Sequence, residues 1–219
     1  MKEKIKKSEE TRRRILDAAL ELFREKGFEQ TTMRDIAERA SMALGAAYYY
    51  FDSKEKLVFA YYQSSLEEMQ EYIGRPAIQE VPGLKERLQL VLDHKFRLMK
   101  PYRSFLGVLF RVAADPSSPL SPFGEETREI RESSIRIYEK IIEGSEPSIP
   151  ADLKVHLPRL LWLLQMGLIL FWLHDRSRGQ IRTKNLQNNS LDLVTSLIRI
   201  GRLPLMGPVR RSVLELLSV

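Results

Sequence analysis

The chain has 219 residues, enough for one large domain or for a small domain joined to a medium one. Its 43% hydrophobic and 29% charged residues are ordinary for a folded protein and exclude a disordered chain. Cysteine is absent, which excludes a disulfide framework, a thiolate metal site and a cysteine nucleophile.

The net charge of +6 is modest, and its most informative part lies at the N-terminus. Between Met1 and Arg14, seven Lys and Arg residues accompany three acidic ones. A basic arm ahead of a folded domain suits an anionic polymer, because Lys and Arg neutralise phosphates and release counterions. A solvated terminus explains the same charges, and on charge alone it is the favoured explanation.

Two further patterns concern membranes and export. The longest apolar stretch, Leu160 to Leu173, has 14 residues, whereas a spanning helix needs roughly 20. We therefore expect a buried core helix there and no membrane partner. No apolar segment follows the basic start within the first 14 residues, so the expected compartment is the cytoplasm.

The first two predicted helices are bounded by recognisable capping residues. Ser8 can cap the first helix, and Gly27 can end it as the residue after the last turn. Thr32 followed by Asp35 has the spacing of a capping box, with Asp in place of the usual Glu. The sequence therefore predicts a short second helix that begins after Thr32.

A third and a fourth helix follow closely. Residues 41–43 form a gap of three residues before a short helix over roughly 44–50. Either Asp52 or Ser53 can cap the fourth helix, which Gly74 and the proline after it end.

Beyond residue 76 the periodicity remains helical and no strand pattern is found. The predicted helices are separated by breaks rich in proline and glycine, at residues 81–83, 100–101, 115–122, 144–150 and 177–183. Residues 115–122 are the longest candidate for an exposed loop without regular structure. The predicted fold class is all-α.

Three helices within residues 9–51, the last two short and joined by a tight turn, predict a helix-turn-helix. In that motif the second helix of the pair enters the major groove, and the first faces phosphate with its N-terminal amides. Gly45 and Ala46 leave room for DNA to approach closely, and the tyrosines at 48–50 offer hydroxyl groups. Three consecutive tyrosines also fit the packing of a small helical domain, so at least one is expected to have a mixed role.

The residues of these helices resemble the DNA-binding half of TetR-family transcriptional regulators. Separate blocks occur in the family's order and spacing, at residues 14–27, 31–40, 45–51 and 53–57. The resemblance covers about residues 10–60. The remainder of the chain resembles the family only in being helical and of suitable length.

The resemblance implies a set of DNA contacts. Thr32 and Lys54 would bind phosphate, and Met33 and Arg34 would lie near the edge of the groove. The implied surface of the recognition helix consists of Leu44, Gly45, Ala46, Tyr48 and Tyr49. Core positions without a direct role would be Ile36, Ala37, Ala40 and Phe51.

The chain departs from the family pattern in the turn and at the start of the recognition helix. Ser41 stands where the family carries Gly; if the site needs a positive φ, Ser costs about 1 kcal/mol. Ala43 and Leu44 replace the usual polar pair. This removes an expected N-cap and phosphate contact, and it offers methyl groups that can pack on thymine C5-methyls.

The second half carries long apolar stripes. Leu157, Leu161, Leu164, Leu168 and Phe171 step by four and three residues, which predicts a seam for another helix. A core without a partner explains the same pattern, but the resemblance implies a four-helix dimer interface. The interface residues expected on this basis are Leu161, Leu164, Leu168, Phe171, Leu193, Val194, Leu197, Ile198 and Gly201.

Family members generally bind a small effector in the second domain. The candidate contacts in this chain are His94, Phe105, Trp162, Gln165 and Trp172. Core packing is the simpler explanation for each aromatic residue. Their abundance favours an apolar or aromatic effector, because ligand pockets are mostly apolar with few polar anchors.

Catalytic and metal-binding motifs are absent. The sequence has no Gly-x-Ser-x-Gly, Walker loop or His-Glu-x-x-His, and its three histidines are scattered. We therefore expect no enzyme activity, no cofactor and no metal.

The sequence favours a homodimeric TetR-type regulator, most simply a repressor that an effector releases from a near-palindromic DNA operator. The expected domains are residues 1–53, the helix-turn-helix with its basic arm, and residues 54–219, for effector binding and dimerisation. Two alternatives remain open. One is a DNA-bound structural or protein-interaction factor without a ligand, and the other is a helical enzyme or carrier that never contacts DNA.

Overall fold

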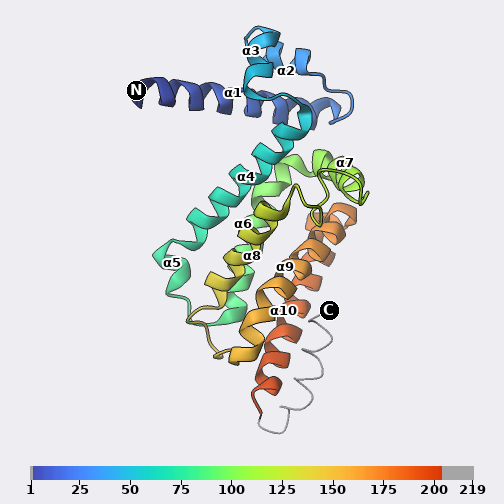
Figure 1. The fold of residues 1–219 in the computed structure, drawn as a ribbon. Helices are drawn as coiled ribbons and strands as arrows, with labels where there is room; N and C mark the ends of the chain where they lie inside the picture. Colours follow the sequence, from blue (N-terminus) through green and yellow to red (C-terminus); the bar gives the residue numbers. More distant parts are fainter. Residues whose placement is uncertain (1, 204–219) are drawn as a thin grey trace. The chain divides into compact units, whose positions relative to one another are not determined.

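The structure is a computed structural model that describes residues 2–203 (Figure 1). Ten α-helices occur in this part of the chain: α1 (Lys2–Lys26), α2 (Met33–Arg39), α3 (Leu44–Tyr50), α4 (Lys54–Ile73), α5 (Pro76–Gln79), α6 (Leu84–Met99), α7 (Arg103–Ala113), α8 (Arg128–Ile142), α9 (Ala151–His174) and α10 (Ile181–Gly201). Two 3₁₀ turns, η1 (Lys100–Tyr102) and η2 (Arg178–Gln180), precede α7 and α10. The predicted all-α class is confirmed.

The chain divides into two compact units. The first comprises Met1–Ser65 and Met99–Arg131, and the second comprises Leu66–Leu98 and Glu132–Val219. This division differs from the predicted boundary after residue 53, because residues 99–131 also belong to the first unit. Helix α4 begins in the first unit and ends in the second.

The start of α1 differs from the expectation. The helix begins at Lys2, so Ser8 is an exposed residue inside the helix and not its cap. Residues 2–7 are mostly Lys and Glu, which have good helix propensity and extend the helix toward the N-terminus. The predicted end is confirmed, because Gly27 has φ +87° and its N–H donates to the carbonyl of Phe23 at 3.2 Å.

The predicted caps of α2 and α4 are present. The N–H of Thr32 donates to Oδ2 of Asp35 at 2.7 Å, and the N–H of Asp35 donates to Oγ1 of Thr32 at 3.2 Å. At α4, the N–H of Lys56 donates to Oγ of Ser53 at 3.3 Å, so Ser53 provides this cap. Both ends satisfy backbone donors that a helix leaves unpaired.

Aromatic rings attach α7 to the N-terminal helices of the first unit. The ring of Phe105 in α7 stacks on Phe23 of α1, with centroids 5.0 Å apart. Phe28 lies 5.1 Å from Phe23, and Tyr61 meets Phe105 edge-on at 5.9 Å. This cluster explains why residues beyond 99 belong to the same unit as the helix-turn-helix.

The segment between α7 and α8 was expected to be an exposed loop, and this is wrong in part. Leu120 and Ser121 are buried. The hydroxyl of Thr127 donates to the carbonyl of Ser121 at 2.5 Å, and Arg131 donates to the carbonyls of Pro122 and Gly124 at 3.0 and 2.9 Å. These bonds provide internal partners for a backbone that a helix does not satisfy.

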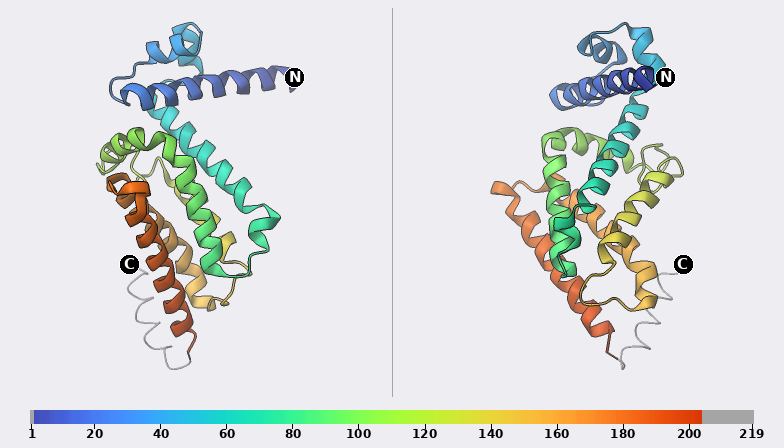
Figure 2. Two further views of the ribbon diagram at one scale, coloured as in Figure 1. Left: turned by 180° about the vertical axis from the view of Figure 1, so that it is seen from behind. Right: turned by 90° about the vertical axis from the view of Figure 1, so that its left-hand side faces the viewer.

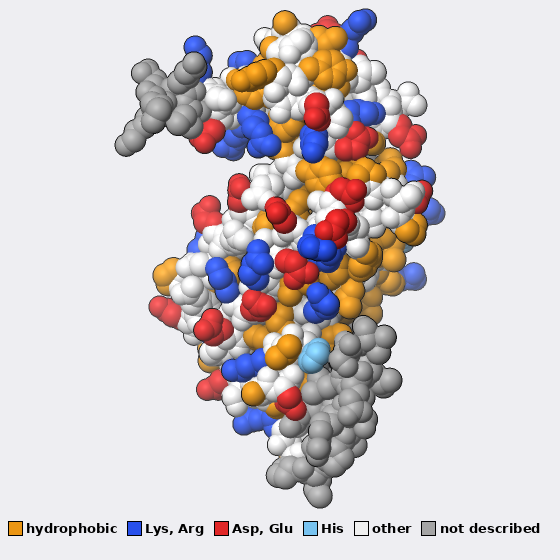
Figure 3. Space-filling model, viewed as in Figure 1, with side chains coloured by type: hydrophobic (Ala, Val, Ile, Leu, Met, Phe, Trp, Pro, Cys, Tyr) orange, Lys and Arg blue, Asp and Glu red, His pale blue; other side chains and the backbone are white. Residues whose placement is uncertain are grey.

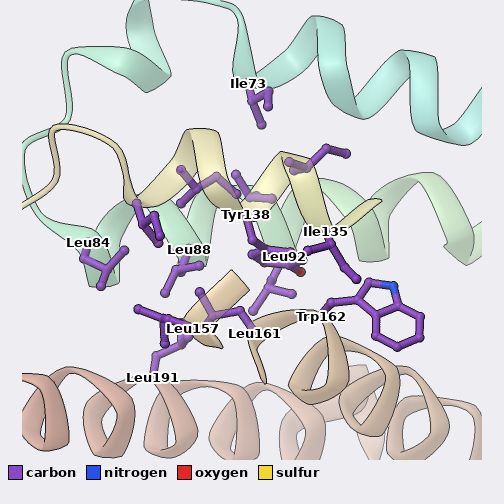
Figure 4. Close-up of a cluster of buried hydrophobic side chains, with 14 of the residues drawn as sticks. Ile73, Leu84, Leu88, Leu92, Ile135, Tyr138, Leu157, Leu161, Trp162 and Leu191 are labelled. Atoms are coloured by element: carbon purple, nitrogen blue, oxygen red, sulfur yellow. The ribbon is translucent and has the colours of Figure 1, made fainter. Parts of the chain in front are cut away.

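The second unit is a helical bundle around one apolar core, which Figure 4 shows in part. Helices α4, α6, α8, α9 and α10 all contribute to it, and its buried members include Ile73, Leu84, Leu88, Leu92, Ile135, Tyr138, Leu157, Leu161, Trp162 and Leu191. By length and composition alone α9 could cross a membrane, but 44% of its most apolar window is buried in this core. It contributes to the core, as the sequence predicts for Leu160 to Leu173.

A buried arginine joins three segments of the second unit. Arg87 in α6 is 8% exposed and donates to the carbonyl of Val81 before its own helix. It also donates to Gln79 at 2.7 Å, to Glu143 at 2.7 Å and to Ile141 at 3.3 Å. The guanidinium therefore satisfies carbonyls at the C-terminal ends of α5 and α8, which these helices leave unpaired.

The connection between α9 and α10 is organised by one carboxylate. Oδ1 of the buried Asp175 accepts from the N–H and hydroxyl of Ser177 at 2.8 and 2.6 Å, and Oδ2 accepts from those of Thr183 at 2.9 and 2.7 Å. These hydrogen bonds lower the pKa of Asp175 well below its ordinary value. The two helices then run side by side in the bundle, as Figure 2 shows.

Candidate nucleic-acid interface

The predicted recognition helix is present and its outer face is exposed. Tyr49 is 84% exposed and Tyr48 is 47% exposed, whereas Ala47 is fully buried. Gly45 and Ala46 are also exposed. The helix therefore buries Ala47 in the core. It presents the small residues Gly45 and Ala46 and the aromatic residues Tyr48 and Tyr49 to solvent. Figure 3 shows hydrophobic side chains at the surface over α2 and α3.

The turn before α3 shows the structural effect of the two departures from the family pattern. Ser41 has φ +55°, a left-handed conformation that glycine adopts at lower cost. The N–H of Met42 donates to the carbonyl of Ala37 at 2.9 Å and holds the turn against α2. Ala43 occupies the N-cap of α3 without a side-chain hydrogen bond.

An ion-pair network fixes α2 against α1. Arg39 contacts the carboxylates of Glu21 at 3.2 Å and Glu25 at 2.7 Å. The hydrogen bond from Arg39 lowers the pKa of Glu25. Arg39 therefore has a structural role within the motif, and its charge is matched by two carboxylates.

Thr32 is exposed at the start of α2, where the sequence predicts a phosphate contact. Its hydroxyl donates to Oδ2 of Asp35 at 2.7 Å, and Nζ of Lys26 lies 2.8 Å from the same oxygen. Hydrogen bonds from Lys26 and Thr32 hold the pKa of Asp35 far below its ordinary value. The hydroxyl of Thr32 therefore already donates its hydrogen to Asp35 and cannot donate it to a phosphate in this conformation. The neighbouring Asp35 is also an anion, which does not favour a phosphate nearby.

The two predicted groove-edge residues differ in exposure. Met33 is only 7% exposed, so its side chain belongs to the core of the motif, which speaks against the predicted DNA contact. Met33 shares its helix face with Ile36 and Ala37, a spacing that already indicates burial in the sequence. Arg34 is exposed.

Lys54, the second predicted phosphate ligand, is half-buried and binds the protein itself. Its Nζ donates to the carbonyl of Phe28 at 2.8 Å and to that of Glu29 at 3.4 Å. The same nitrogen lies 4.6 Å from the centroid of the Phe28 ring. Lys54 therefore anchors the loop between α1 and α2 to the start of α4.

Arg12 is a basic residue beside the motif that the sequence did not single out as a contact. Its Cζ lies 4.9 Å from the ring centroid of Phe51, the C-cap residue that follows α3. Arg12 remains exposed, so the ring holds a positive charge next to the recognition helix. The basic run at residues 12–14 could have indicated a positive charge near the motif. The sequence alone does not show which of these residues packs on Phe51.

The comparisons with known proteins agree with this geometry. A family model described as "Bacterial regulatory proteins, tetR family" matches residues 15–61, and one described as "Tetracyclin repressor-like, C-terminal domain" matches residues 87–215. The second match alone covers more than half of the chain. The protein belongs to the TetR family. It is a DNA-binding transcriptional regulator.

Relatives in sequence are regulators as well. The transcriptional repressor KstR of Rhodococcus jostii is 28% identical over 172 residues, which are 77% of this chain and 75% of that protein. The fatty acid metabolism regulator protein of Bacillus subtilis is 36% identical over 87 residues, covering 39% of this chain and 43% of that protein.

Solved structures share the TetR fold at lower identity. GusR of Salmonella enterica has a TM-score of 0.64 at 22% identity and covers 86% of this chain and 95% of that one. FadR of Bacillus subtilis, solved in complex with stearoyl-CoA, has a TM-score of 0.58 at 23% identity and covers 82% and 95%.

In this TetR-family chain, most of the predicted effector residues are core residues. Trp162 and Trp172 are 5% and 2% exposed. Gln165 is buried, and its Oε1 accepts from the hydroxyl of Tyr138 at 2.8 Å. Phe105 is fully buried in the first unit, so it does not share a unit with the other four.

His94 is the exception among these residues. Its ring stacks on Tyr72 with centroids 3.7 Å apart and planes 4° apart. Nη2 of Arg97 lies 3.4 Å from Nδ1, while Nε2 is buried and has no hydrogen-bond partner among the described residues. Burial and then the charge of Arg97 lower the pKa of His94, so the ring is neutral at pH 7.

A pocket of about 560 Å³ in the second unit contains none of the predicted effector residues. It is lined by Gln70, Ile73, Gly74, Gln79, Arg87, Lys140, Glu143 and Gly144. The Arg87 guanidinium in this pocket is already bound to backbone carbonyls. Among the side chains that the structure describes, no group of three or more His, Asp or Glu is placed to hold a metal ion.

The residues predicted for a dimer interface divide between the surface and the core: Phe171, Leu193 and Leu197 are exposed, whereas others are buried. Leu161, Leu168 and Ile198 are buried in their own core at 3%, 1% and 3% exposure. Val194 and Leu164 pack against that core, and Gly201 approaches Leu153 of the same chain. The large apolar residues that stay exposed on the two helices include Leu160, Leu163, Leu170, Phe171, Leu186, Leu193, Leu197 and Ile200.

Proposed function

We propose that the protein is a homodimeric repressor that leaves a near-palindromic operator when a small apolar or aromatic effector binds the second unit. The exposed outer face of α3, held on a helix-turn-helix with TetR-family sequence, is the observation that carries the proposal. As a binding protein of this kind, it acts in the cytoplasm, where the DNA is. A catalytic role is not part of the proposal.

DNA docking uses the exposed residues of the motif. Tyr48 and Tyr49 enter the major groove with Gly45 and Ala46, while Arg34 reaches the flanking phosphates. Arg12 adds a second positive charge beside α3. Thr32 and Lys54 contribute chiefly by holding α2 and the preceding loop, because their polar groups are bound within the protein.

Dimerisation uses α9 and α10. Most of the exposed apolar residues recur at intervals of three, four or seven, so each helix presents one apolar face. It consists of Leu160, Leu163, Leu170 and the adjacent Phe171 on α9, and of Leu186, Leu193, Leu197 and Ile200 on α10. Gly167, also exposed, lies within the first face. Packing these faces against a second copy yields a four-helix interface and removes the exposed leucines from water.

A dimer explains how the recognition helix α3 of each subunit can contribute to binding one operator. Recognition helices about 34–36 Å apart fit successive major grooves of a near-palindrome. An effector that prefers a conformation with another spacing releases the DNA. A hundredfold loss of operator occupancy requires a preference of about 2.7 kcal/mol for the released conformation.

His94 is the residue we assign to effector recognition. Arg97 can only donate, so Nδ1 of His94 accepts and the buried Nε2 carries the hydrogen. An effector with an acceptor oxygen satisfies this donor. The stearoyl-CoA bound to FadR and the name of the fatty acid regulator support long-chain acyl compounds as the first to test.

The DNA part is tested with a duplex that the full-length protein selects from a random pool. We expect an enriched near-palindrome whose affinity falls steeply with salt concentration. Arg34→Ala should weaken binding to every sequence and reduce the slope of log affinity against log salt concentration by about 1. Arg159→Ala in the second unit should leave the affinity and this slope unchanged. If no sequence is enriched, the protein does not act through this motif.

The effector part is tested by adding stearoyl-CoA, free stearate or coenzyme A to the same complex. We expect an acyl compound to release the duplex and to raise the melting temperature of the free protein. His94→Leu should lose this response with unchanged DNA affinity, and His94→Gln, which keeps a donor, should retain part of it. Tight DNA binding that no acyl or aromatic compound alters would favour a ligand-independent factor.

A further inference from the structure

The exposed face of α3 lacks the side chains that read guanine and adenine edges. Arg or Lys recognises guanine, and Asn or Gln recognises adenine, through paired hydrogen bonds in the major groove. Between Ala43 and Tyr50 no Lys, Arg, Asn, Gln, Asp or Glu occurs. The short exposed residues are Ala43, Gly45 and Ala46, which offer methyl groups and backbone only.

Gly45 is not required by the free protein. It lies inside a helix, and a Cβ at this position would meet nothing within 4 Å. Glycine in such a position costs roughly 0.5–1 kcal/mol relative to alanine. Because neither the backbone nor the packing uses the missing side chain, the space above Gly45 is free for a partner that approaches the helix.

Two alanines near Gly45, Ala43 and Ala46, are likewise short residues at exposed positions. The N-cap residue Ala43 forms no side-chain hydrogen bond, although Ser, Thr or Asp there would stabilise α3 by about 1 kcal/mol. Ala46 is exposed one turn further along the helix. The helix therefore forgoes local stability while presenting short apolar residues to solvent. We call Ala43, Gly45 and Ala46 the methyl patch.

We propose that the methyl patch reads thymine. The methyl groups of Ala43 and Ala46 pack on thymine C5-methyls, and the backbone at Gly45 lies directly against the groove edge. Each operator half-site is then specified by thymines at fixed positions and not by hydrogen bonds to guanine. This inference rests on the proposed DNA docking and gives it a sequence preference.

Replacing thymine by uracil tests the inference, because uracil lacks only the C5-methyl group. The probe is the duplex selected by the full-length protein, with one thymine per half-site changed at a time. We expect about a fourfold loss of affinity at each contacted thymine, the value of one buried methyl group. Uracil outside the protected footprint should have no effect.

A double-mutant cycle assigns the contact to one residue. Ala46→Gly should lower affinity for the thymine duplex, and the uracil effect at one position should disappear in this variant. If uracil lowers the affinity of Ala46→Gly as much as that of the wild type at every position, Ala46 does not contact thymine. Circular dichroism at the assay temperature confirms that the variant is folded.

Gly45→Ala provides an independent test with opposite effects on stability and binding. The added methyl should raise the melting temperature and reduce operator affinity at least tenfold, because it occupies the space needed by DNA. Gly107→Ala in α7 is the matched control, since a Cβ there also meets nothing within 4 Å. It should raise the melting temperature similarly without changing affinity.

The outcomes separate this inference from the proposed function. A pool without an enriched sequence contradicts the proposed function itself. An enriched site whose thymines all tolerate uracil, or an unchanged affinity for Gly45→Ala, leaves DNA regulation intact and overturns thymine reading. Enrichment of guanine at the conserved positions overturns it as well.

Discussion

Ser41 illustrates how one residue sets the geometry of the motif at a cost in stability. Its φ of +55° turns the chain between α2 and α3, and a residue with a Cβ is strained there. We predict that Ser41→Gly increases the free energy of unfolding by about 1 kcal/mol. Thermal denaturation measures the change.

Ser64→Gly is the control for this prediction. Ser64 is exposed inside α4, where glycine should destabilise the protein by up to about 1 kcal/mol. If both variants change stability in the same direction, strain at Ser41 is not the cause.

Residue patterns predicted local structure better than they predicted the role of individual polar groups. The cap at Thr32 and the bounds of α3 followed from residue type and spacing alone, whereas the choice of Ser53 over Asp52 as the cap of α4 came from the structure. The side chain of Lys54 was expected to bind phosphate, yet it binds carbonyls 25 and 26 residues away in sequence. Such a long-range partner depends on how helices pack, which a single sequence does not encode locally.

Among the elements, the α9–α10 connection depends on the charge of Asp175. We predict that Asp175→Asn lowers the melting temperature at pH 7 by about 2–4 °C, because the amide replaces a charged acceptor of four hydrogen bonds. The folded pKa of Asp175 is depressed, so its stabilisation is present above the unfolded pKa and is lost as the pH falls toward the folded pKa.

The pH dependence distinguishes charge from shape at this position. The difference between wild type and Asp175→Asn should be constant above about pH 5 and should shrink as the pH falls below about 4. Melting curves between pH 3 and pH 8 measure it. A difference that stays constant down to pH 3 would mean that the carboxylate charge is unimportant.

Arg87 joins elements that are distant in sequence, and its loss should be costly. Arg87→Met keeps the apolar stem but leaves buried carbonyls of the α5 and α8 ends without a donor. We predict that it lowers the free energy of unfolding by about 3 kcal/mol. Urea denaturation measures the loss.

Arg159→Met is the comparison for Arg87→Met. Arg159 is exposed and pairs with Glu132 at 3.5 Å, so its replacement should cost less than about 0.5 kcal/mol. Equal losses for both variants would contradict the role of Arg87 as a link between helix ends.

The register of α9 shows what a pattern of leucines does and does not determine. This helix is apolar on several sides, so the stepping of Leu157, Leu161 and Leu168 correctly indicated a packing seam. The seam faces the protein's own core, and the exposed stripe at 160, 163 and 170 lies elsewhere on the same helix. Periodicity identifies a buried stripe but does not state which neighbour buries it.

For the whole molecule, we predict a dimer held by the exposed stripes. The double variant Leu193→Asp with Leu197→Asp places charges on residues that are 60% and 57% exposed, so the monomer should fold normally. Burying these charges in a dimer is unfavourable, and sedimentation should show a species of half the wild-type mass. Operator affinity should fall by at least tenfold, because a monomer binds only one half-site of the operator.

Phe123→Asp is the control at this scale. Phe123 is 64% exposed in the first unit, away from α9 and α10 in sequence, and its replacement should leave the dimer intact. A double variant that still sediments as the wild type would show that another surface joins the subunits.

Helix α4 is one uninterrupted rod of 20 residues, about 30 Å in length. Its first residue, Lys54, is tethered through its ammonium group to the loop that leads into α2. A rod of this length converts a tilt of about 6° into a displacement of about 3 Å at its tip, roughly one base-pair step along a duplex. In the proposed release mechanism, a compound bound at the Ile73 end would therefore need to tilt this helix by only a few degrees to move its DNA-binding end out of register with the groove.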